Sequence, residues 1–348
     1  MKDKVHSKAQ SYYYSRLPKV DLHRHLEGSL RVQSLTEIAR THGITLPLRP
    51  SLKALVQVQP DDPFTFTSFL SKFQTLRMFY LSPQIISRLT FEAIQDAATD
   101  RVRYLELRFT PVALSRLKNF QLADVMDWVC VSTWQASQAN GITTRLIASV
   151  NRHEDPELAR QVVDLAIARK SNGIVGIDLA GNEAEFSAEP FREILKKAKD
   201  NGLSLSVHAG EWGGAENVRH AIEELEADRI AHGVRVLEDE RVTALALQRG
   251  TVFEVCPTSN YHTGVFPDLS KHTLKRMLDA GLKVTINTDD PGISNITLSN
   301  EYEIACTKVG LSHQELIRTI FTAVEASFQS SEEKKLLSDR LKKEIQAT

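Results

Sequence analysis

Two histidines one residue apart mark the part of the sequence that could carry out chemistry. His23 and His25 lie near the end of a short, mostly apolar run, and Gly28 follows soon after. If this run is a β-strand, side chains two residues apart point to the same face, so the two imidazoles lie side by side. Two such imidazoles can bind a metal ion, although histidines also occur as ordinary polar residues of strands. The pair indicates a metal site only if other segments supply further ligands and a base.

Further histidines and carboxylates follow three other apolar runs. His208 and Glu211 stand three residues apart at a glycine-containing turn, His232 precedes Gly233, and Asp289 and Asp290 precede a proline. Each has an ordinary interpretation as a packed histidine, a helix N-terminal acid or a turn residue. Independent surface residues are not expected to gather at the ends of four apolar runs. We therefore interpret the whole set as one site.

The residue types in this set suit metal-assisted hydrolysis. Zinc prefers imidazole and carboxylate ligands, and it lowers the pKa of a water molecule that takes its open position. The histidines at 23, 25 and 208 and one of the two adjacent aspartates can supply the ligands. Glu211 could donate a proton if burial raises its pKa, while His232 and the other aspartate could orient the water and take its proton. The expected reaction is hydrolysis at an electrophilic carbon.

A single metal ion is expected rather than a pair. Two-metal hydrolases of similar fold need a bridging ligand, often a modified lysine, after the fourth strand. The corresponding segment here, Asp178-Leu179-Ala180-Gly181, contains no lysine. The predicted cofactor is therefore one zinc ion per chain, although such ligands also accept other divalent metals.

Eight short apolar runs, rich in β-branched residues, are spread along the chain. Continuous apolar runs are typical of parallel strands buried on both faces, and apolar residues at three- and four-residue spacing predict helices between them. Eight strand–helix repeats predict a TIM-type (β/α)8 barrel, in which the carboxyl ends of the strands carry the active site. The predicted strands are Val20–Leu26, Tyr104–Phe109, Thr144–Val150, Val175–Leu179, Leu203–Val207, Arg229–His232, Val252–Val255 and Lys283–Asn287. Predicted helices include Glu157–Arg169, Glu189–Asn201, Ala215–Glu226 and Lys271–Ala280.

The predicted barrel carries additions. Roughly eighty residues separate the first two strands, which is more than a crossover helix needs, so we expect a helical insert at about residues 30–103. Two capping-box patterns, Ser312-x-x-Glu315 and Ser330-x-x-Glu333, predict extra helices after the last strand. No linker or repeat divides the chain, so residues 1–348 are expected to form a single domain.

One helix of the insert attracts particular interest. Thr65–Tyr80 places Phe69, Leu70, Phe73 and Leu76 on one side. Such apolar stripes usually belong to the core. The alternative is that part of this stripe covers the mouth of the barrel.

The composition excludes several classes of protein. With 348 residues, 42% hydrophobic and 25% charged, and a net charge of -1, the chain is an ordinary globular protein without the basic excess of a nucleic-acid binder. Met1–Ser15 lacks the apolar centre of a signal peptide, and no apolar run is long enough to cross a bilayer. Cys130, Cys256 and Cys306 are too few and too far apart to predict disulfides or a cysteine zinc site. We expect a cytoplasmic protein with neither nucleic acid nor membrane as a partner.

Six short motifs, in order along nearly the whole chain, resemble those of the adenosine deaminase family of the amidohydrolase superfamily. A lone H-x-H would be weak, but the ordered series is specific. The motifs are His23-Arg24-His25-Leu26-Glu27-Gly28, Asp178-Leu179-Ala180-Gly181-Asn182-Glu183, His208-Ala209-Gly210-Glu211, Ala231-His232-Gly233, Cys256-Pro257-Thr258-Ser259-Asn260 and Asn287-Thr288-Asp289-Asp290-Pro291.

The resemblance implies hydrolytic, zinc-dependent removal of the 6-amino group of a purine. It implies that Glu211 protonates the ring nitrogen beside the attacked carbon, that His232 positions and deprotonates the attacking water, and that Asp290 orients this water. The implied zinc ligands are His23, His25, His208 and Asp289. The implied substrate contacts are His25, Glu27, the backbone of Gly181, Asp290, and a hydrophobic gate of Phe69, Leu70 and Phe73. The H-x-E and P-C-x-x-C signature of the cytidine-type zinc deaminases is absent from the sequence.

The resemblance does not decide the identity of the substrate, because residue 27 differs from many adenosine-specific members. Glu27 stands where many adenosine-specific members have aspartate, at the place expected to meet the ribose 5′-hydroxyl, and glutamate resembles the adenine-specific branch and some bacterial nucleoside branches. Thr258–Gly264 and the Phe-Leu-x-Lys-Phe segment resemble the adenosine branch. The Ala-Gly of His208–Glu211 is less usual in the branch acting on N-methylated AMP. We expect conversion of adenosine and 2′-deoxyadenosine to inosine and 2′-deoxyinosine.

Two alternatives remain beside this expectation. The first is a deaminase of free adenine or of a 5′-modified adenosine such as aminodeoxyfutalosine. The second is a catalytically silent nucleoside-binding protein, which the presence of every ligand and of the proton donor disfavours. The sequence predicts no oligomeric state.

Overall fold

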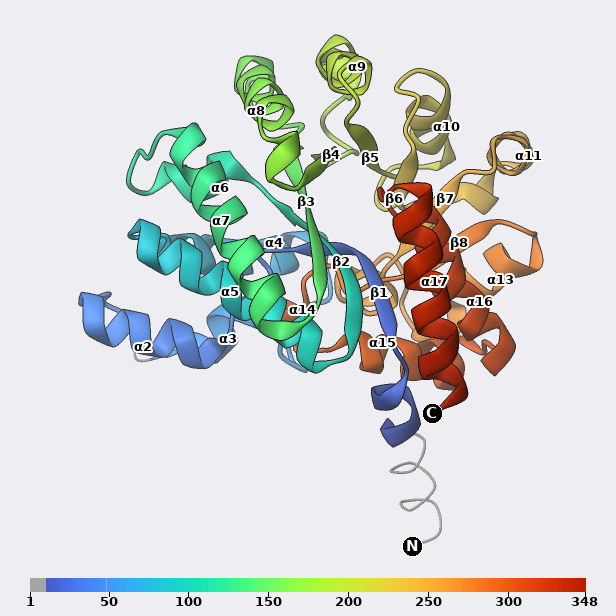
Figure 1. The fold of residues 1–348 in the computed structure, drawn as a ribbon, viewed down its shortest axis with the longest axis horizontal. Helices are drawn as coiled ribbons and strands as arrows, with labels where there is room; N and C mark the ends of the chain where they lie inside the picture. The colour runs from blue at the N-terminus through green and yellow to red at the C-terminus, as the bar shows by residue number, and fades with distance from the viewer. Residues whose placement is uncertain (1–10, 48) are drawn as a thin grey trace, which may run out of the picture.

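A single parallel sheet organises the chain. The structure, a computed structural model, describes residues 11–47 and 49–348, so the first ten residues of the Met1–Ser15 segment lie outside the described residues. Eight strands follow one another in the order β1 to β8, and the sheet curves into a barrel with helices around its outside (Figure 1). The strands are β1 (Lys19–His25), β2 (Val102–Phe109), β3 (Thr143–Asn151), β4 (Ile174–Ala180), β5 (Ser204–Ala209), β6 (Arg229–His232), β7 (Val252–Val255) and β8 (Lys283–Ile286).

The barrel closes between its first and last strands. An isolated parallel bridge joins Arg24 of β1 to Asp289, which lies just beyond β8. The N–H of Asp289 donates to the carbonyl of His23, and the N–H of His25 donates to the carbonyl of Asp289, both at 2.8 Å. The predicted TIM-type (β/α)8 barrel is confirmed, with strand bounds within about two residues of the apolar runs.

The helices that follow the strands cover the barrel. The main ones are α7 (Leu122–Asn140), α8 (Pro156–Ala168), α9 (Arg192–Asp200), α10 (Ala215–Glu223), α11 (Glu240–Arg249) and α13 (Leu274–Asp279). The predicted helix Glu157–Arg169 is present at the same length as α8, whereas the other three predicted helices are shorter. The one expected from Lys271 begins at Leu274, because the backbone of His272 is extended, with φ -61° and ψ 138°.

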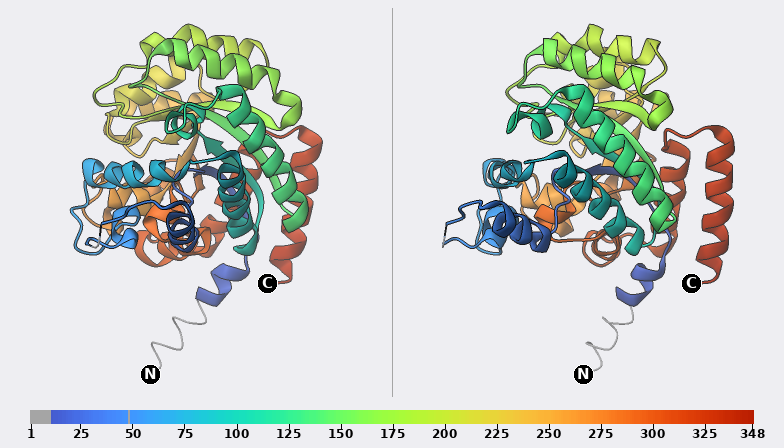
Figure 2. Two further views of the ribbon diagram at one scale, coloured as in Figure 1. Left: turned by 90° about the vertical axis from the view of Figure 1, so that its left-hand side faces the viewer. Right: turned by 60° about the vertical axis from the view of Figure 1, so that its left-hand side comes forward.

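The helical insert lies between β1 and β2, as expected, and contacts the carboxyl end of β8. It contains α2 (Val32–His42), α3 (Leu52–Val56), α4 (Phe66–Leu76), the turn η1 (Arg77–Phe79) and α5 (Pro83–Thr99). The N–H of Val58 donates to the carbonyl of Ile293, in the short helix α14 (Pro291–Ser294), at 2.9 Å. Figure 2 shows these blue insert helices beside the orange segment that follows β8. The insert therefore lies at the end of the barrel where the predicted site lies.

Two helices complete the chain after β8. In α16 (His313–Ala326) and α17 (Ser331–Gln346), the N-cap serine and the glutamate three residues later form the predicted capping box. Helix α16 packs against β1 and β8, so it supports the strands at the point of closure. No helix in the described ranges is long and apolar enough to cross a membrane. The assignment of residues 1–348 to one domain stays a prediction.

The interior of the barrel contains buried charge. Arg108, Arg229 and Glu254 are almost inaccessible to solvent. The Nη2 of Arg108 lies 2.6 Å from Glu254 Oε2, and Arg229 forms ion pairs with Glu254 and with Glu106. Buried charges of this kind are tolerated only when they are paired. This charge cluster (Arg108, Arg229, Glu106 and Glu254) lies in the barrel beneath the candidate site.

Candidate metal centre and active site

Three imidazoles and one carboxylate meet at the ends of β1, β5 and β8. One ring nitrogen from each of His23, His25 and His208 lies within 4.8 Å of the others. The Oδ1 of Asp289 is 3.2 Å from His23 Nε2 and 3.3 Å from His25 Nε2. The structure thus brings together the four side chains predicted as metal ligands.

Two carboxylates orient these imidazoles from behind. Asp178 Oδ1 lies 2.9 Å from His208 Nδ1, and Glu254 Oε2 lies 3.1 Å from His23 Nδ1. A carboxylate on Nδ1 keeps the hydrogen there and directs the lone pair of Nε2 toward the metal position. Among the described residues, neither buried ring nitrogen of His23 has a hydrogen bond of good geometry, although Glu254 and Asp289 lie close to them. This donor set fits a zinc ion.

Asp289 is held in an uncommon backbone conformation. Its φ is +58°, in the left-handed region that non-glycine residues seldom adopt. Its Oδ2 accepts a hydrogen bond from Ser259 Oγ at 2.6 Å. Although burial alone would raise the pKa of Asp289, its neighbours, chiefly the imidazole of His23, outweigh this effect and hold the pKa well below its usual range. The carboxylate is therefore ionised, as a metal ligand must be.

Glu211 lies in a turn that another carboxylate fixes. The carboxylate of Glu183 accepts the backbone N–H groups of Gly210, Glu211 and Trp212 at 2.8, 2.6 and 2.9 Å. Burial, together with the charges of Asp289 and Glu183, raises the pKa of Glu211 well above its usual range. A carboxyl group that stays protonated near neutral pH can act as a general acid.

His232 lies between Glu211 and Asp289. Its Nε2 is 3.6 Å from Glu211 Oε2 and 3.8 Å from Asp289 Oδ2. Burial lowers the pKa of His232 well below its usual range, so its ring is neutral. Its φ of +61° is another left-handed conformation beside the site. Such backbone strain is concentrated at functional sites.

Asp290 and Glu27 each present an unpaired oxygen. Asp290 Oδ1 and Glu27 Oε2 are buried and lack a hydrogen-bond partner in the described part of the chain. Both residues line the site cavity, whose volume is about 500 Å³. The other oxygen of Glu27 accepts the N–H of Thr110, which fixes the carboxylate at the end of β2. A ligand with hydrogen-bond donors could satisfy both free oxygens.

Helix α4 forms one wall of the cavity. Phe69, Leu70 and Phe73 all line it, as does Gly181 at the end of β4. Phe69 is buried, whereas Leu70 is 40% exposed. Both interpretations of the apolar stripe therefore hold, because Leu76 lies in the core while these three residues face the cavity. All the predicted site residues line this cavity except His23, which is fully buried.

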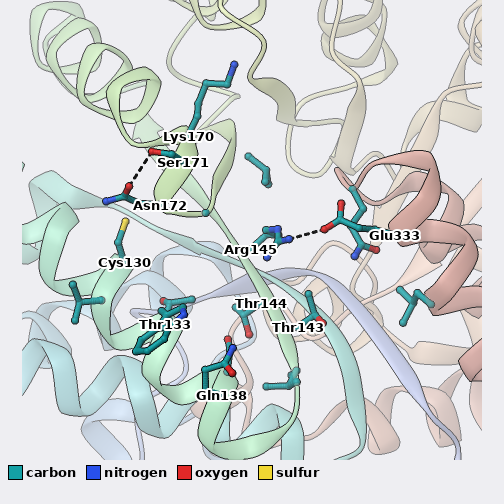
Figure 3. A pocket seen from close by; sticks show the side chains of 18 of the residues that line it. Cys130, Thr133, Gln138, Thr143, Thr144, Arg145, Lys170, Ser171, Asn172 and Glu333 are labelled. Atoms are coloured by element: carbon teal, nitrogen blue, oxygen red, sulfur yellow. Dashed lines mark hydrogen bonds and ion pairs between the residues drawn. The ribbon is translucent and has the colours of Figure 1, made fainter.

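A larger cavity, of about 880 Å³, lies elsewhere (Figure 3). Its lining includes Thr143 and Arg145 from the start of β3 and Gly173 just before β4, and the ion pair from Arg145 to Glu333 of α17 lies beside it. It therefore lies toward the amino ends of the strands, where barrel enzymes seldom carry an active site. Volume alone does not identify the functional cavity.

Sequence reasoning missed the supporting residues. Asp178, Glu183 and Asn260 stood in quoted motifs without a role, although each contacts a predicted site residue. Glu254 was passed over inside an apolar run. The sequence did contain a signal for Glu254: a charged residue within a buried strand must have a polar or charged partner.

Comparison with known proteins agrees with this geometry. A family model described as adenosine deaminase matches residues 18–344. The chain belongs to the adenosine deaminase family. Adenosine deaminases of Shigella flexneri serotype 5b and Escherichia coli O1:K1 are each 34% identical to it over 328 residues, which is 93% of this chain and 98% of either relative. This member of the adenosine deaminase family is accordingly a hydrolytic deaminase.

Solved structures of similar proteins differ in substrate. A zinc-bound amidohydrolase from Burkholderia ambifaria has a TM-score of 0.88 at 27% identity, covering 97% of this chain and 93% of its own. The adenine deaminase of Arthrobacter aurescens has a TM-score of 0.87 at 26% identity, covering 95% and 99%. The N6-methyl-AMP deaminase of Arabidopsis thaliana has a TM-score of 0.85 at 27% identity, covering 96% and 98%. Membership of the adenosine deaminase family thus fixes the type of reaction but not the purine.

Proposed function

We propose that the protein is a zinc-dependent deaminase of adenosine and 2′-deoxyadenosine, with one zinc ion per chain. The observation that supports the proposal is the convergence of Glu211, His232 and Asp290 on one cavity beside the four candidate metal ligands. His23, His25, His208 and Asp289 would hold the metal. A bound zinc ion would activate a water molecule for attack on the purine carbon.

The chain's own residues divide the remaining work. Glu211, protonated because of its burial, would donate its proton to the ring nitrogen beside the attacked carbon. His232 and Asp290 would orient the attacking water. Gly181 would contact the pyrimidine edge of the base through its backbone, and its φ of +95° suits a glycine there. Phe69, Leu70 and Phe73 would cover the bound purine and exclude water.

Glu27 supports a nucleoside rather than a nucleotide. Its free Oε2 lines the cavity and can accept a hydrogen bond from a ribose hydroxyl. A 5′-phosphate would bring like charge to a buried carboxyl group, which is unfavourable. Free adenine remains a second candidate, because an adenine deaminase shares the fold closely. A 5′-modified adenosine such as aminodeoxyfutalosine also remains, since its 5′ extension is not a phosphate. We further propose a cytoplasmic enzyme whose partner is this small purine substrate.

One assay separates these substrates. Zinc-loaded protein would be given adenosine, 2′-deoxyadenosine, adenine, AMP and aminodeoxyfutalosine, and ammonia release would be measured as kcat/KM. We expect the two nucleosides to exceed adenine and AMP by at least about ten-fold, because a buried carboxylate left without its hydroxyl partner costs binding energy. A higher value for adenine would replace the proposed substrate. Release of no ammonia from any purine by folded, metal-loaded protein would contradict the proposed function.

A further inference from the structure

A line of hydrogen bonds runs beneath the active site from the start of α13. The backbone N–H of Leu274 donates to Nδ1 of His272 at 3.0 Å. Because a backbone N–H can only donate, Nδ1 accepts and the ring hydrogen of neutral His272 lies on Nε2. His272 is buried, and this burial lowers its pKa to about 3, so the ring is neutral in ordinary buffers.

The orientation of His272 fixes the amide of Asn260, in the short helix α12 (Pro257–His262). Nε2 of His272 lies 3.2 Å from Asn260 Oδ1, so the ring donates and the amide oxygen accepts. The NH2 group of Asn260 must then face the other way. It lies 3.0 Å from Glu211 Oε1 and 3.1 Å from His232 Nδ1, which is one acceptor for each of its two hydrogens. Asn260 is fully buried, so solvent offers it no other partner.

These bonds determine where two protons lie. His232 Nδ1 accepts from Asn260, so the hydrogen of the neutral ring lies on Nε2, the nitrogen that faces Glu211 and Asp289. Glu211 Oε1 also accepts from Asn260, so a protonated Glu211 carries its hydrogen on Oε2. The side-chain amide of Asn260 thereby determines the position of the hydrogen on both His232 and Glu211.

We propose that Asn260, held by His272, is a positioning residue that places the hydrogen of His232 on Nε2 and that of Glu211 on Oε2. The proposal rests on the proposed function, which assigns both groups to the reaction. It gives His232 the task of orienting the attacking water by donating Nε2–H to the water oxygen. In this tautomer Nε2 has no lone pair with which to take the water's proton.

The sharpest variant is Asn260→Asp, which has nearly the same shape. It keeps the acceptor for His272 but replaces the NH2 group by an oxygen, so His232 would turn its ring hydrogen to Nδ1. We expect kcat to fall by about 100-fold or more while KM stays within about three-fold, because a wrong tautomer impairs the reaction rather than ground-state binding. Zinc content should remain near that of the wild type, whereas the new buried carboxyl group should lower the urea unfolding midpoint.

A second variant tests the line itself. His272→Phe keeps a ring against Phe266, whose centroid lies 4.5 Å away, but removes both ring nitrogens. We expect kcat to fall by about ten-fold, and the double variant with Asn260→Asp to be no worse than Asn260→Asp alone, since residues in one network are not additive. His262→Phe is the matched control. His262 lies on α12 and its Nδ1 contacts Ser294 rather than the line, so kcat should change by less than about two-fold.

A direct measurement needs no turnover. In zinc-loaded protein with 15N-labelled histidine, the ring nitrogens of His232, assigned against His232→Gln, should show a hydrogen on Nε2 in the wild type and on Nδ1 in Asn260→Asp. A hydrogen on Nδ1 in the wild type would overturn the proposal, as would undiminished kcat in Asn260→Asp. If the wild type released no ammonia, the proposed function would fail while the 15N spectrum still tested the tautomer.

Discussion

The carboxylate of Asp290 lies against the backbone of Gly28, with no room for a side chain between them. A Cβ at position 28 would come within 1.7 Å of Asp290 Oδ1. This contact joins the loop after β1 to the loop after β8, so the glycine at the end of the first motif and the aspartate of the last one depend on each other.

Gly28→Ala should therefore displace Asp290. We expect kcat/KM to fall by about 100-fold or more, because the side chain that orients water and substrate moves while the metal ligands remain. Activity and zinc content should be measured together. Gly43→Ala is a control at a position where a Cβ meets nothing within 4 Å, although its φ of +65° carries a small backbone cost. Unchanged activity in Gly28→Ala would show that Asp290 has no part in turnover.

Glu211→Gln should separate proton donation from metal binding. Glutamine has nearly the same shape but no acidic proton, so we expect turnover to fall by about 100- to 10,000-fold with full zinc occupancy. Metal analysis and single-turnover kinetics would measure the two effects. Loss of zinc would instead make Glu211 a ligand.

Metal affinity should depend on two layers of residues. His208→Ala removes a predicted ligand, and we expect it to lose zinc during dialysis against a weak chelator. Asp178→Asn leaves all ligands but weakens the support of His208 Nδ1, so zinc affinity should fall by about 10- to 100-fold. Competition with a chromogenic chelator would measure both. Full occupancy in His208→Ala would refute the ligand assignment.

Glu254→Gln should destabilise the fold as well as the site. Glu254 pairs with two buried arginines and supports His23, so neutralising it leaves buried positive charge without compensation. We expect the free energy of unfolding to fall by about 3 to 5 kcal/mol. Glu344→Gln, which breaks partly exposed pairs with Arg101 and Arg103, should cost under about 1 kcal/mol. Equal urea midpoints for the two variants would contradict this difference.

The free energy of unfolding should depend on pH because of Glu301. Burial raises the pKa of Glu301 to about 8 from the ordinary 4.5, and Oε2 accepts the N–H of Thr258. Between pH 4.5 and 8 the folded state keeps a proton that the unfolded chain releases, so this group lowers stability as pH rises through that range. The full effect above pH 8 is on the order of 5 kcal/mol.

Glu301→Gln should remove this pH dependence. Its free energy of unfolding, measured with urea at several values from pH 5 to pH 8.5, should gain on the wild type as pH rises. Glu325→Gln, at an exposed position of α16, is the matched control and should follow the wild-type curve. Parallel curves for Glu301→Gln and the wild type would disprove the effect.

The barrel could be predicted because its strands repeat along the sequence, and the candidate ligands could be grouped because they lie at strand ends. Eight apolar runs mark the strands, and His23, His208 and Asp289 each follow or end a run. What supports them could not be predicted, because it depends on side chains that meet across the barrel. Glu254 contacts His23 from a strand more than 200 residues away, and no local pattern connects the two.

The hydrogen bonds from Leu274 through His272 to Asn260 could not be predicted for the same reason. His272 and Asn260 are twelve residues apart, one in the predicted helix Lys271–Ala280 and the other in the motif Cys256–Asn260, and nothing in the sequence connects them. Their role follows only from the backbone N–H of Leu274, which fixes the orientation of both. Helix α13 begins three residues later than predicted because His272 has an extended backbone.

The closing bridge between Arg24 and Asp289 has a consequence for synthesis in the cell. The candidate ligands His23 and His25 are synthesised before Asp289, which lies more than 200 residues further along the chain. A nascent chain that ends before β8 has an open barrel and an incomplete ligand set. If these residues bind the metal as proposed, tight binding requires β8 to be in place, and a ribosome-bound chain halted before residue 283 should bind zinc more weakly than the released protein.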